Sequence, residues 1–207
     1  MSEIFYLERT THGTNAITLK TKLFENRIIF LDSEINSESV NTTIAQIALL
    51  STENPHEPIT ILINTPGGSI LHGKVLIDVM KACPCTIQTI SLGIAASMGA
   101  VILAAGTKGY RFVSPSSQVM VHQPLIAGGM PGGSCSEIES VANTLIKTKN
   151  ELDKFLSELT GKPIKTIRRL TSKDTYMNAE EALEYGLVDK IADADELNKL
   201  LTGGVTE

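Results

Sequence analysis

Short runs of apolar, mostly β-branched residues alternate along this chain with segments whose apolar residues recur at helical spacing. In chain order, the expected elements are a strand at residues 27–31, a helix at 40–48, a strand at 59–63, a helix at 70–80, a strand at 86–92, a helix at 95–105, and strands near 110–113 and 119–121. Strands that alternate with helices in this way pack into a mainly parallel sheet whose faces the helices cover. The sequence therefore predicts an α/β fold.

A glycine-rich segment interrupts the alternation at residues 125–134. It contains four glycines and a proline, so it cannot form a stable helix, and we expect an extended, adaptable arm. Apolar residues at helical spacing over residues 138–159 then predict one long amphipathic helix. Ser134 or Ser136 is the expected N-cap, and Gly161 is expected to end the helix.

The composition indicates a single globular domain. Of the 207 residues, 42% are hydrophobic and 20% are charged, and no abrupt change of composition divides the chain. No apolar run approaches the ~20 residues that a membrane span requires. The first residues lack a basic region followed by an apolar stretch, so we expect no signal peptide and a cytoplasmic protein. The net charge of −5 and the scattered basic residues argue against nucleic acid as the main partner.

The three cysteines form neither a redox motif nor a zinc site. Cys83 and Cys85 are separated by one residue, and Cys135 lies far along the chain, so no C-x-x-C pair can be written. We therefore expect reduced structural thiols, no bound metal, and an activity that chelators do not affect.

Two junctions between an expected strand and the following helix carry residues that suit catalysis. Residues 64–68 end in Gly67 and Gly68, whose unobstructed backbone N–H groups can stabilise a negative charge at a helix N-terminus. A plain turn is the alternative there. Residues 93–99 contain Ser97 among small neighbours, so its hydroxyl can be presented as a nucleophile. A helix-capping serine is the alternative.

A nucleophilic serine needs a base, and the chain offers four histidines. His12 lies in a polar segment and His56 lies in a proline-flanked turn, so we expect both to be exposed. His72 follows the glycine pair on an expected helix and is the rival candidate. His122 ends an apolar strand where the chain leaves the sheet; a structural histidine is the alternative unless it acts together with Ser97.

The base in turn needs an acceptor that fixes its tautomer, and a carboxylate supplies one. Asp174 lies in a polar segment that we expect to be a loop between two helices, and it can reach inward. Spacing alone does not distinguish it from Asp78, Asp153 or Glu180. From the residues alone, the chain is a candidate serine hydrolase.

Five motifs, read in order, resemble those of the Clp protease proteolytic subunit, the ClpP family of ATP-dependent serine endopeptidases. They are residues 63–68 (INTPGG), 93–100 (GIAASMGA), 103–109 (LAAGTKG), 120–125 (MVHQPL) and 178–189 (NAEEALEYGLVD). The resemblance extends over nearly the whole chain, from Arg27 to Ile191.

The resemblance implies a crotonase-like Clp protease fold of repeated β-β-α units, with a protruding handle made by one long helix and a glycine-rich strand. It also implies that Ser97 is the nucleophile, His122 the general base and then acid, and Asp174 the orienting carboxylate. Gly68 and Met98 would offer backbone N–H groups to the oxyanion. The loss of one such donor typically costs ~10²–10³ in rate. No metal and no cofactor of its own is implied.

By the same resemblance, residues 1–20 would form an N-terminal axial segment and residues 196–207 a C-terminal tail. Residues 21–195 would form the protease domain, with its handle at about 123–161. Subunits would assemble as heptameric rings stacked into a tetradecamer, or mixed with a paralogue, around a chamber for unfolded polypeptide substrates. An AAA+ unfoldase of the ClpX, ClpC or ClpA type would use ATP to feed the chamber, and neither nucleic acid nor membrane would be a partner.

Several positions depart from the family's pattern. The glycine-rich arm is a few residues longer, and Ser172 and Lys173 replace an acidic residue and an arginine that pair across the rings. A lysine does not replace a bidentate arginine contact. Thr60, Leu62 and Ala82 stand where the pocket for the unfoldase's loop is aromatic. These departures suit a divergent second paralogue, and they leave ring pairing and the choice of unfoldase open.

Two alternatives to a self-sufficient endopeptidase follow. One is a ring subunit that acts mainly as a scaffold or regulator and depends on a second proteolytic subunit. The other is a crotonase-type acyl-CoA enzyme, which shares the architecture and uses backbone amides as an oxyanion hole, but would not need Ser97 and His122. A fluorophosphonate probe separates the endopeptidase from the acyl-CoA enzyme, because only an activated serine is labelled.

Overall fold

The computed structural model describes residues 5–10, 13–126 and 132–202. The strands of these residues are β1 (Phe5–Thr10), β2 (Gly13–Thr18), β3 (Ile28–Leu31), β4 (Ile59–Thr65), β5 (Ile87–Ala96), β6 (Arg111–Val113), β7 (Gln118–Val121), β8 (Thr175–Met177) and β9 (Lys190–Ile191). The helices are α1 (Leu19–Glu25), α2 (Ser37–Glu53), α3 (Ile70–Ala82), α4 (Met98–Ala104), α5 (Cys135–Thr160), α6 (Ile164–Thr171), α7 (Ala179–Glu184) and α8 (Ala194–Thr202).

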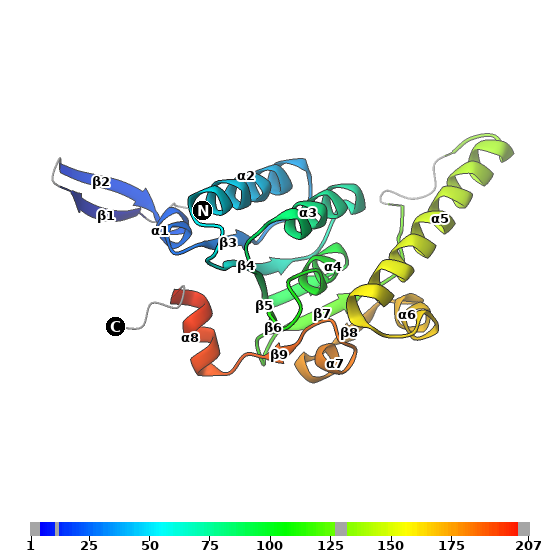
Figure 1. Ribbon diagram of the computed structural model, residues 1–207. Coiled ribbons are helices and arrows are strands. Elements are labelled where there is room, and N and C mark those ends of the chain that lie inside the picture. The colour runs from blue at the N-terminus through cyan, green and yellow to red at the C-terminus, as the bar shows by residue number, and fades with distance from the viewer. Residues whose placement is uncertain (1–4, 11–12, 127–131, 203–207) are drawn as a thin grey trace.

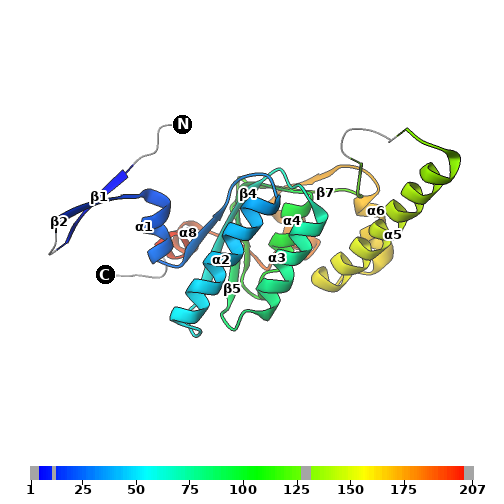
Figure 2. The same ribbon diagram turned by 90° about the horizontal axis from the view of Figure 1, so that it is seen from above.

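The main sheet follows the strand order β3-β4-β5-β6-β9, while β7 pairs with β5 and β8 pairs with β7. Neighbouring strands of this sheet are parallel except for β7 and β8. Figures 1 and 2 show α2 and α3 side by side against the sheet, with α5 projecting from the body at the end opposite the β1–β2 hairpin. The predicted α/β fold is confirmed. In the part of the chain described, no helix has both the length and the apolar character that a bilayer crossing needs.

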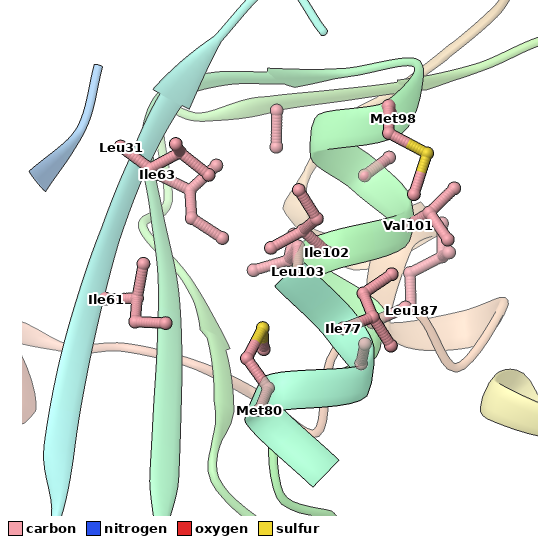
Figure 3. Close-up of a cluster of buried hydrophobic side chains, with 14 of the residues drawn as sticks. Leu31, Ile61, Ile63, Ile77, Met80, Met98, Val101, Ile102, Leu103 and Leu187 are labelled. Atoms are coloured by element: carbon pink, nitrogen blue, oxygen red, sulfur yellow. The ribbon is translucent and has the colours of Figure 1, made fainter. Parts of the chain in front are cut away.

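The central strands β4 and β5 are buried at most positions because both faces of the sheet are covered. On β4, Ile61 and Ile63 are fully buried and point toward α4 and α3, whose Leu103 and Met80 fill the same layer (Figure 3). Burial of one such side chain contributes about 1.5–3 kcal/mol to folding. This layer fixes α4 against β4 and β5, and the first turn of α4 follows Ser97.

The predicted helix at residues 95–105 is wrong at its beginning. Ala95 and Ala96 continue β5 and pair with Val119 and Met120 of β7, and α4 begins only at Met98. A run of small residues carries no helical or strand periodicity, so the neighbouring strand decides its conformation.

The long helix of the predicted handle is confirmed as α5. Its N-cap is Ser134, whose side chain accepts a hydrogen bond from the Glu137 N–H, and Gly161 ends it in the left-handed region at φ 71°. The glycine-rich arm remains a prediction, because residues 127–131 lie outside the described residues. The described residues on either side of that gap, 122–126 and 132–134, have no regular secondary structure.

The C-terminal helix α8 includes residues 196–202, which belong to the segment predicted as a tail. Its Leu200 is buried in a cluster with Ile28, Leu62 and Phe112, and Leu197 packs against this cluster. The helix therefore packs on the face of the sheet that carries Leu62, opposite the face that carries Ile61 and Ile63.

A buried ion pair joins the C-terminal part of the chain to the sheet. Arg111 donates from Nη2 to Oδ1 of Asp189 over 2.6 Å, and from Nη1 to the carbonyls of Ala104 and Leu159. Burial raises the pKa of Asp189, but the Arg111 hydrogen bonds, its charge, and the backbone amides of Gly109 and Arg111 outweigh this effect, so the pKa lies below its ordinary value of 3.8. One arginine thus connects β6 with the C-terminal ends of α4 and α5.

We expect Asp189→Asn to lower the free energy of unfolding by about 3 kcal/mol at neutral pH, because it leaves the Arg111 charge buried without its partner. Asp32→Asn, which breaks the exposed pair with Lys20, is the control and should cost less than about 1 kcal/mol. Urea unfolding measures both.

The pH dependence of this loss follows from the lowered pKa of Asp189. The stability that the ionised carboxylate contributes is present above pH 3.8 and is lost as the pH falls through the lower folded-state pKa. The difference between wild type and Asp189→Asn should therefore shrink below that pH. A difference that stays constant down to acid unfolding would contradict this account.

Candidate active site

The site lies at the end of β5, a strand that pairs along one of its edges first with β6 and then with β7. Residues 89–91 of β5 pair with β6, and residues 94–96 pair with β7. Gly93 lies between the two pairings at φ 106°, and a Cβ there would lie 2.7 Å from Oδ1 of Asn64. The same Asn64 oxygen accepts a hydrogen bond from the Ile94 N–H. Only glycine fits this bend, which directs the end of β5 along β7.

Ser97 follows this second half of β5 in a strained conformation, at φ 53° and ψ −118°. A positive φ is uncommon for a residue with a side chain and is often found at functional sites. The Ser97 N–H donates to the Met120 carbonyl over 2.8 Å, which ties the turn to β7. Its side chain makes no capping hydrogen bond, although it stands at the N-cap of α4. The hydroxyl is therefore available to another partner.

That partner is His122, which follows the last residue of β7. Its Nε2 lies 2.8 Å from Oγ of Ser97, and 15% of its side chain is exposed. The two residues meet because β5 and β7 are parallel neighbours that end at the same edge of the sheet.

Asp174 lies on the other side of the imidazole. Asp174 directly precedes β8, whose first residue, Thr175, pairs with Val121 at the end of β7. Because the two strands are antiparallel, the next residue after Val121, His122, lies opposite Asp174. Oδ1 of Asp174 is 3.5 Å from Nδ1 of His122, a distance longer than a good hydrogen bond. A carboxylate at Nδ1 favours the tautomer in which Nε2 accepts a proton from the serine. The predicted loop between two helices is wrong on one side, because a strand follows Asp174.

The other sequence candidates do not converge on Ser97. Nδ1 of His72 lies 2.9 Å from Oγ of Ser69, the N-cap of α3. Among the remaining candidates, His56, Asp78 and Glu180 are exposed, and His12 lies outside the described residues. Asp153 is buried near the site, but its carboxylate accepts hydrogen bonds from Thr171 and Lys149. The structure thus brings together Ser97, His122 and Asp174.

The glycine pair lies directly against the serine turn. A Cβ on Gly67 would be 2.7 Å from both Cβ of Ser97 and the carbonyl oxygen of Ala96. In the bridge between Ile35 and Gly68, the hydrogen bonds run from Ile35 N–H to Gly67 and from Ser69 N–H to Ile35. The N–H of Gly68 is therefore directed away from Ile35. The sequence singled out Gly68 but did not reveal the contact of Gly67 with Ser97.

Two adjoining hollows flank these residues. A small cavity of about 30 Å³ is lined by Ser97, His122 and apolar side chains, and also by the buried Asp153. A groove of about 520 Å³ runs between α3 and α5 and shares Ile70 and Pro124 with the cavity. The other groove residues are Leu71, Lys74, Leu125, Ile126, Ser140, Val141, Thr144, Leu145, Thr148 and Glu151.

Among the described residues, no group of three or more histidine, cysteine, aspartate or glutamate side chains could hold a metal ion. The chemistry that the described site can perform is that of a hydroxyl, an imidazole, a carboxylate and backbone N–H groups.

A comparison with protein families assigns the chain. A family model described as Clp protease matches residues 11–195, which is most of the sequence and includes the three converging residues. Members of this family are serine proteases that generally form oligomeric rings with AAA+ partners. The fold described above, with its mostly parallel sheet and covering helices, agrees with that match. The chain therefore belongs to the Clp protease family.

Proposed function

We propose that this protein is a serine endopeptidase that hydrolyses peptide bonds of unfolded polypeptides inside a chamber of stacked heptameric rings. An AAA+ unfoldase uses ATP to feed the chamber, and the protease subunit itself needs no cofactor. The observation that carries the proposal is the 2.8 Å contact between Oγ of Ser97 and Nε2 of His122. The Ser97 backbone is strained, and among the described residues the hydroxyl has a hydrogen bond to the imidazole and none to the backbone of α4, an arrangement that suits attack rather than capping.

In the proposed reaction, Oγ of Ser97 attacks the carbonyl carbon of the scissile peptide bond as its proton passes to Nε2 of His122. Asp174 stabilises the imidazolium through Nδ1. His122 then gives the proton to the leaving amine, and an acyl-enzyme ester remains on Ser97. Water, deprotonated by His122, hydrolyses this ester and restores both residues.

The oxyanion of each tetrahedral intermediate needs donors that are free before the substrate binds. We propose the backbone N–H groups of Gly68 and Met98. Met98 is the first residue of α4, so its N–H has no partner within the helix. The N–H of Gly68 is directed away from Ile35, and Gly67 places this glycine pair in contact with Ser97.

The exposure of Asp174 favours the dependent-subunit alternative as a second candidate. Its side chain is 64% exposed, and the neighbouring Ser172 and Lys173 are also exposed. A second ring could supply contacts that draw Asp174 closer to His122. The acyl-CoA alternative is not favoured, because it gives no role to the contact between Ser97 and His122.

The positions that form the unfoldase-loop pocket in this family are poorly suited to docking in this protein. Thr60 and Leu62 are both buried, and Leu62 lies in the cluster that Leu200 of α8 completes. The partner unfoldase would therefore have to bind a neighbouring surface or displace α8.

Ser97→Ala should lower peptide hydrolysis by ~10⁶-fold and abolish labelling by a fluorophosphonate probe, because it removes the nucleophile. Ser116→Ala changes an exposed serine and is the matched control, with wild-type activity expected. A fluorogenic peptide and mass spectrometry of the labelled protein measure the two effects. Hydrolysis that persists in Ser97→Ala would refute the assignment.

Gly67→Ala should lower kcat by ~10²-fold or more, because the new Cβ must displace the Ser97 turn. Gly109→Ala is the control for backbone strain: φ is 91° at Gly109 and 98° at Gly67, but a Cβ on Gly109 meets nothing within 4 Å. Both variants should lose about 1–3 kcal/mol of stability, and only Gly67→Ala should lose activity. Equal activity losses would contradict the proposed geometry.

A further inference from the structure

Asp153, on α5, is a buried carboxylate that the proposed reaction does not use. Only 1% of the residue is exposed, and burying a charge is costly unless it is paired and hydrogen-bonded. Its Oδ1 accepts a 2.8 Å hydrogen bond from the Thr171 hydroxyl, and its Oδ2 accepts one of 2.8 Å from Nζ of Lys149. Nε of Arg168 lies 3.9 Å from Oδ2. The carboxylate therefore links α5 to α6.

This link lies at the wall of the active-site cavity. Asp153 and Thr171 both line the small cavity that also contacts Ser97 and His122. The hydrogen bonds of Asp153 go to Thr171 and Lys149 and not to the imidazole. Asp153 thus has a fixed place beside the site without acting as the partner of Nδ1.

Thr171 is the last residue of α6, and Asp174 follows it three residues later in the chain. Beyond Asp174, the Thr175 hydroxyl donates to the Leu170 carbonyl over 2.7 Å, which closes the segment back onto α6. The Asp174 side chain is mostly exposed, so its position depends on the backbone that carries it. That backbone is held at the end of α6, where Thr171 is buried and bound to Asp153.

We propose that Asp153 is a positioning residue, which fixes Asp174 opposite His122 by holding the end of α6 through the Thr171 hydroxyl. This inference rests on the proposed function and adds to it a connection between α5, the projecting helix, and the alignment of the base. A movement of α5 would reach Asp174 along this path.

Three segments contribute charged groups near His122. The segment before β8 contributes Asp174 at Nδ1 and the exposed Lys173 nearby in sequence. Across the cavity, α5 contributes Asp153 with Lys149, and α6 contributes Arg168. The residues that α3 and α4 place in the cavity, among them Ile70 and Met98, are uncharged.

The test compares Thr171→Val, which keeps the shape of the side chain but removes the hydroxyl, with Thr171→Ser, which retains a hydroxyl. Each is made in the wild-type chain and in Asp174→Asn, and kcat and KM are measured with a fluorogenic peptide. We expect Thr171→Val to lower kcat about 10-fold with little change in KM, because misplaced catalytic groups reduce turnover.

Two further results are expected. Thr171→Ser should restore the wild-type kcat, and Thr171→Val should have no additional effect on kcat in the Asp174→Asn background, since its effect passes through Asp174. Overturning results are an unchanged kcat in a folded Thr171→Val protein, or an equal loss of kcat in both backgrounds, which would indicate a general structural role.

Asp153→Asn keeps the test decisive if Thr171→Val fails to fold. An amide oxygen can still accept from Thr171, so the kcat of Asp153→Asn should match wild type, whereas Asp153→Leu, which offers no acceptor, should lower kcat about 10-fold; equal kcat values in the two variants would overturn the proposal. Failure of the proposed function is distinguishable from these outcomes, because the wild-type protein would then show neither Ser97-dependent hydrolysis nor fluorophosphonate labelling.

Discussion

The change of partner along β5 is the constraint on which the candidate site depends. The first half of the strand pairs with β6, and beyond Gly93 the second half pairs with β7. This bend sets the end of β5 beside the end of β7, so Ser97 and His122 meet although 24 residues separate them in the sequence. The pairing of β7 with β8 then places Asp174 on the far side of the imidazole. Backbone pairing thus brings the three side chains together.

The backbone packs tightly around Ser97, the residue whose conformation is strained. Gly67 leaves no room for a side chain beside Ser97, and the Ser97 N–H is bonded to Met120. Such contacts hold a residue at positive φ at a cost of about 1–3 kcal/mol, which the apolar layer between β4 and α4 offsets. Asp174, in contrast, is exposed and lies 3.5 Å from His122. Ser97 and His122 are held by the core of the protein, whereas the position of Asp174 is proposed to depend on the segment that α6 and α5 hold.

The sequence predicts much of this arrangement, and its errors have physical causes. β-branched runs such as residues 59–63 identify buried parallel strands, and Ser134 and Gly161 identify both ends of α5. Residues 95–96 are small and lack periodicity, so only their pairing with β7 shows that they continue a strand. Asp174 could not be separated from Asp153 by spacing, because the distinction arises from the β7–β8 register and from the Thr171 hydroxyl that engages Asp153.

The central claim is that Ser97 attacks a carbonyl whose oxyanion is bound by the amides of Gly68 and Met98. A crystal structure of the protein after reaction with diisopropyl fluorophosphate tests it most directly. The account predicts a covalent bond from phosphorus to Oγ of Ser97, with the phosphoryl oxygen about 2.7–3.1 Å from both backbone nitrogens. An unmodified Ser97, or an adduct whose phosphoryl oxygen points away from the two amides, would contradict it.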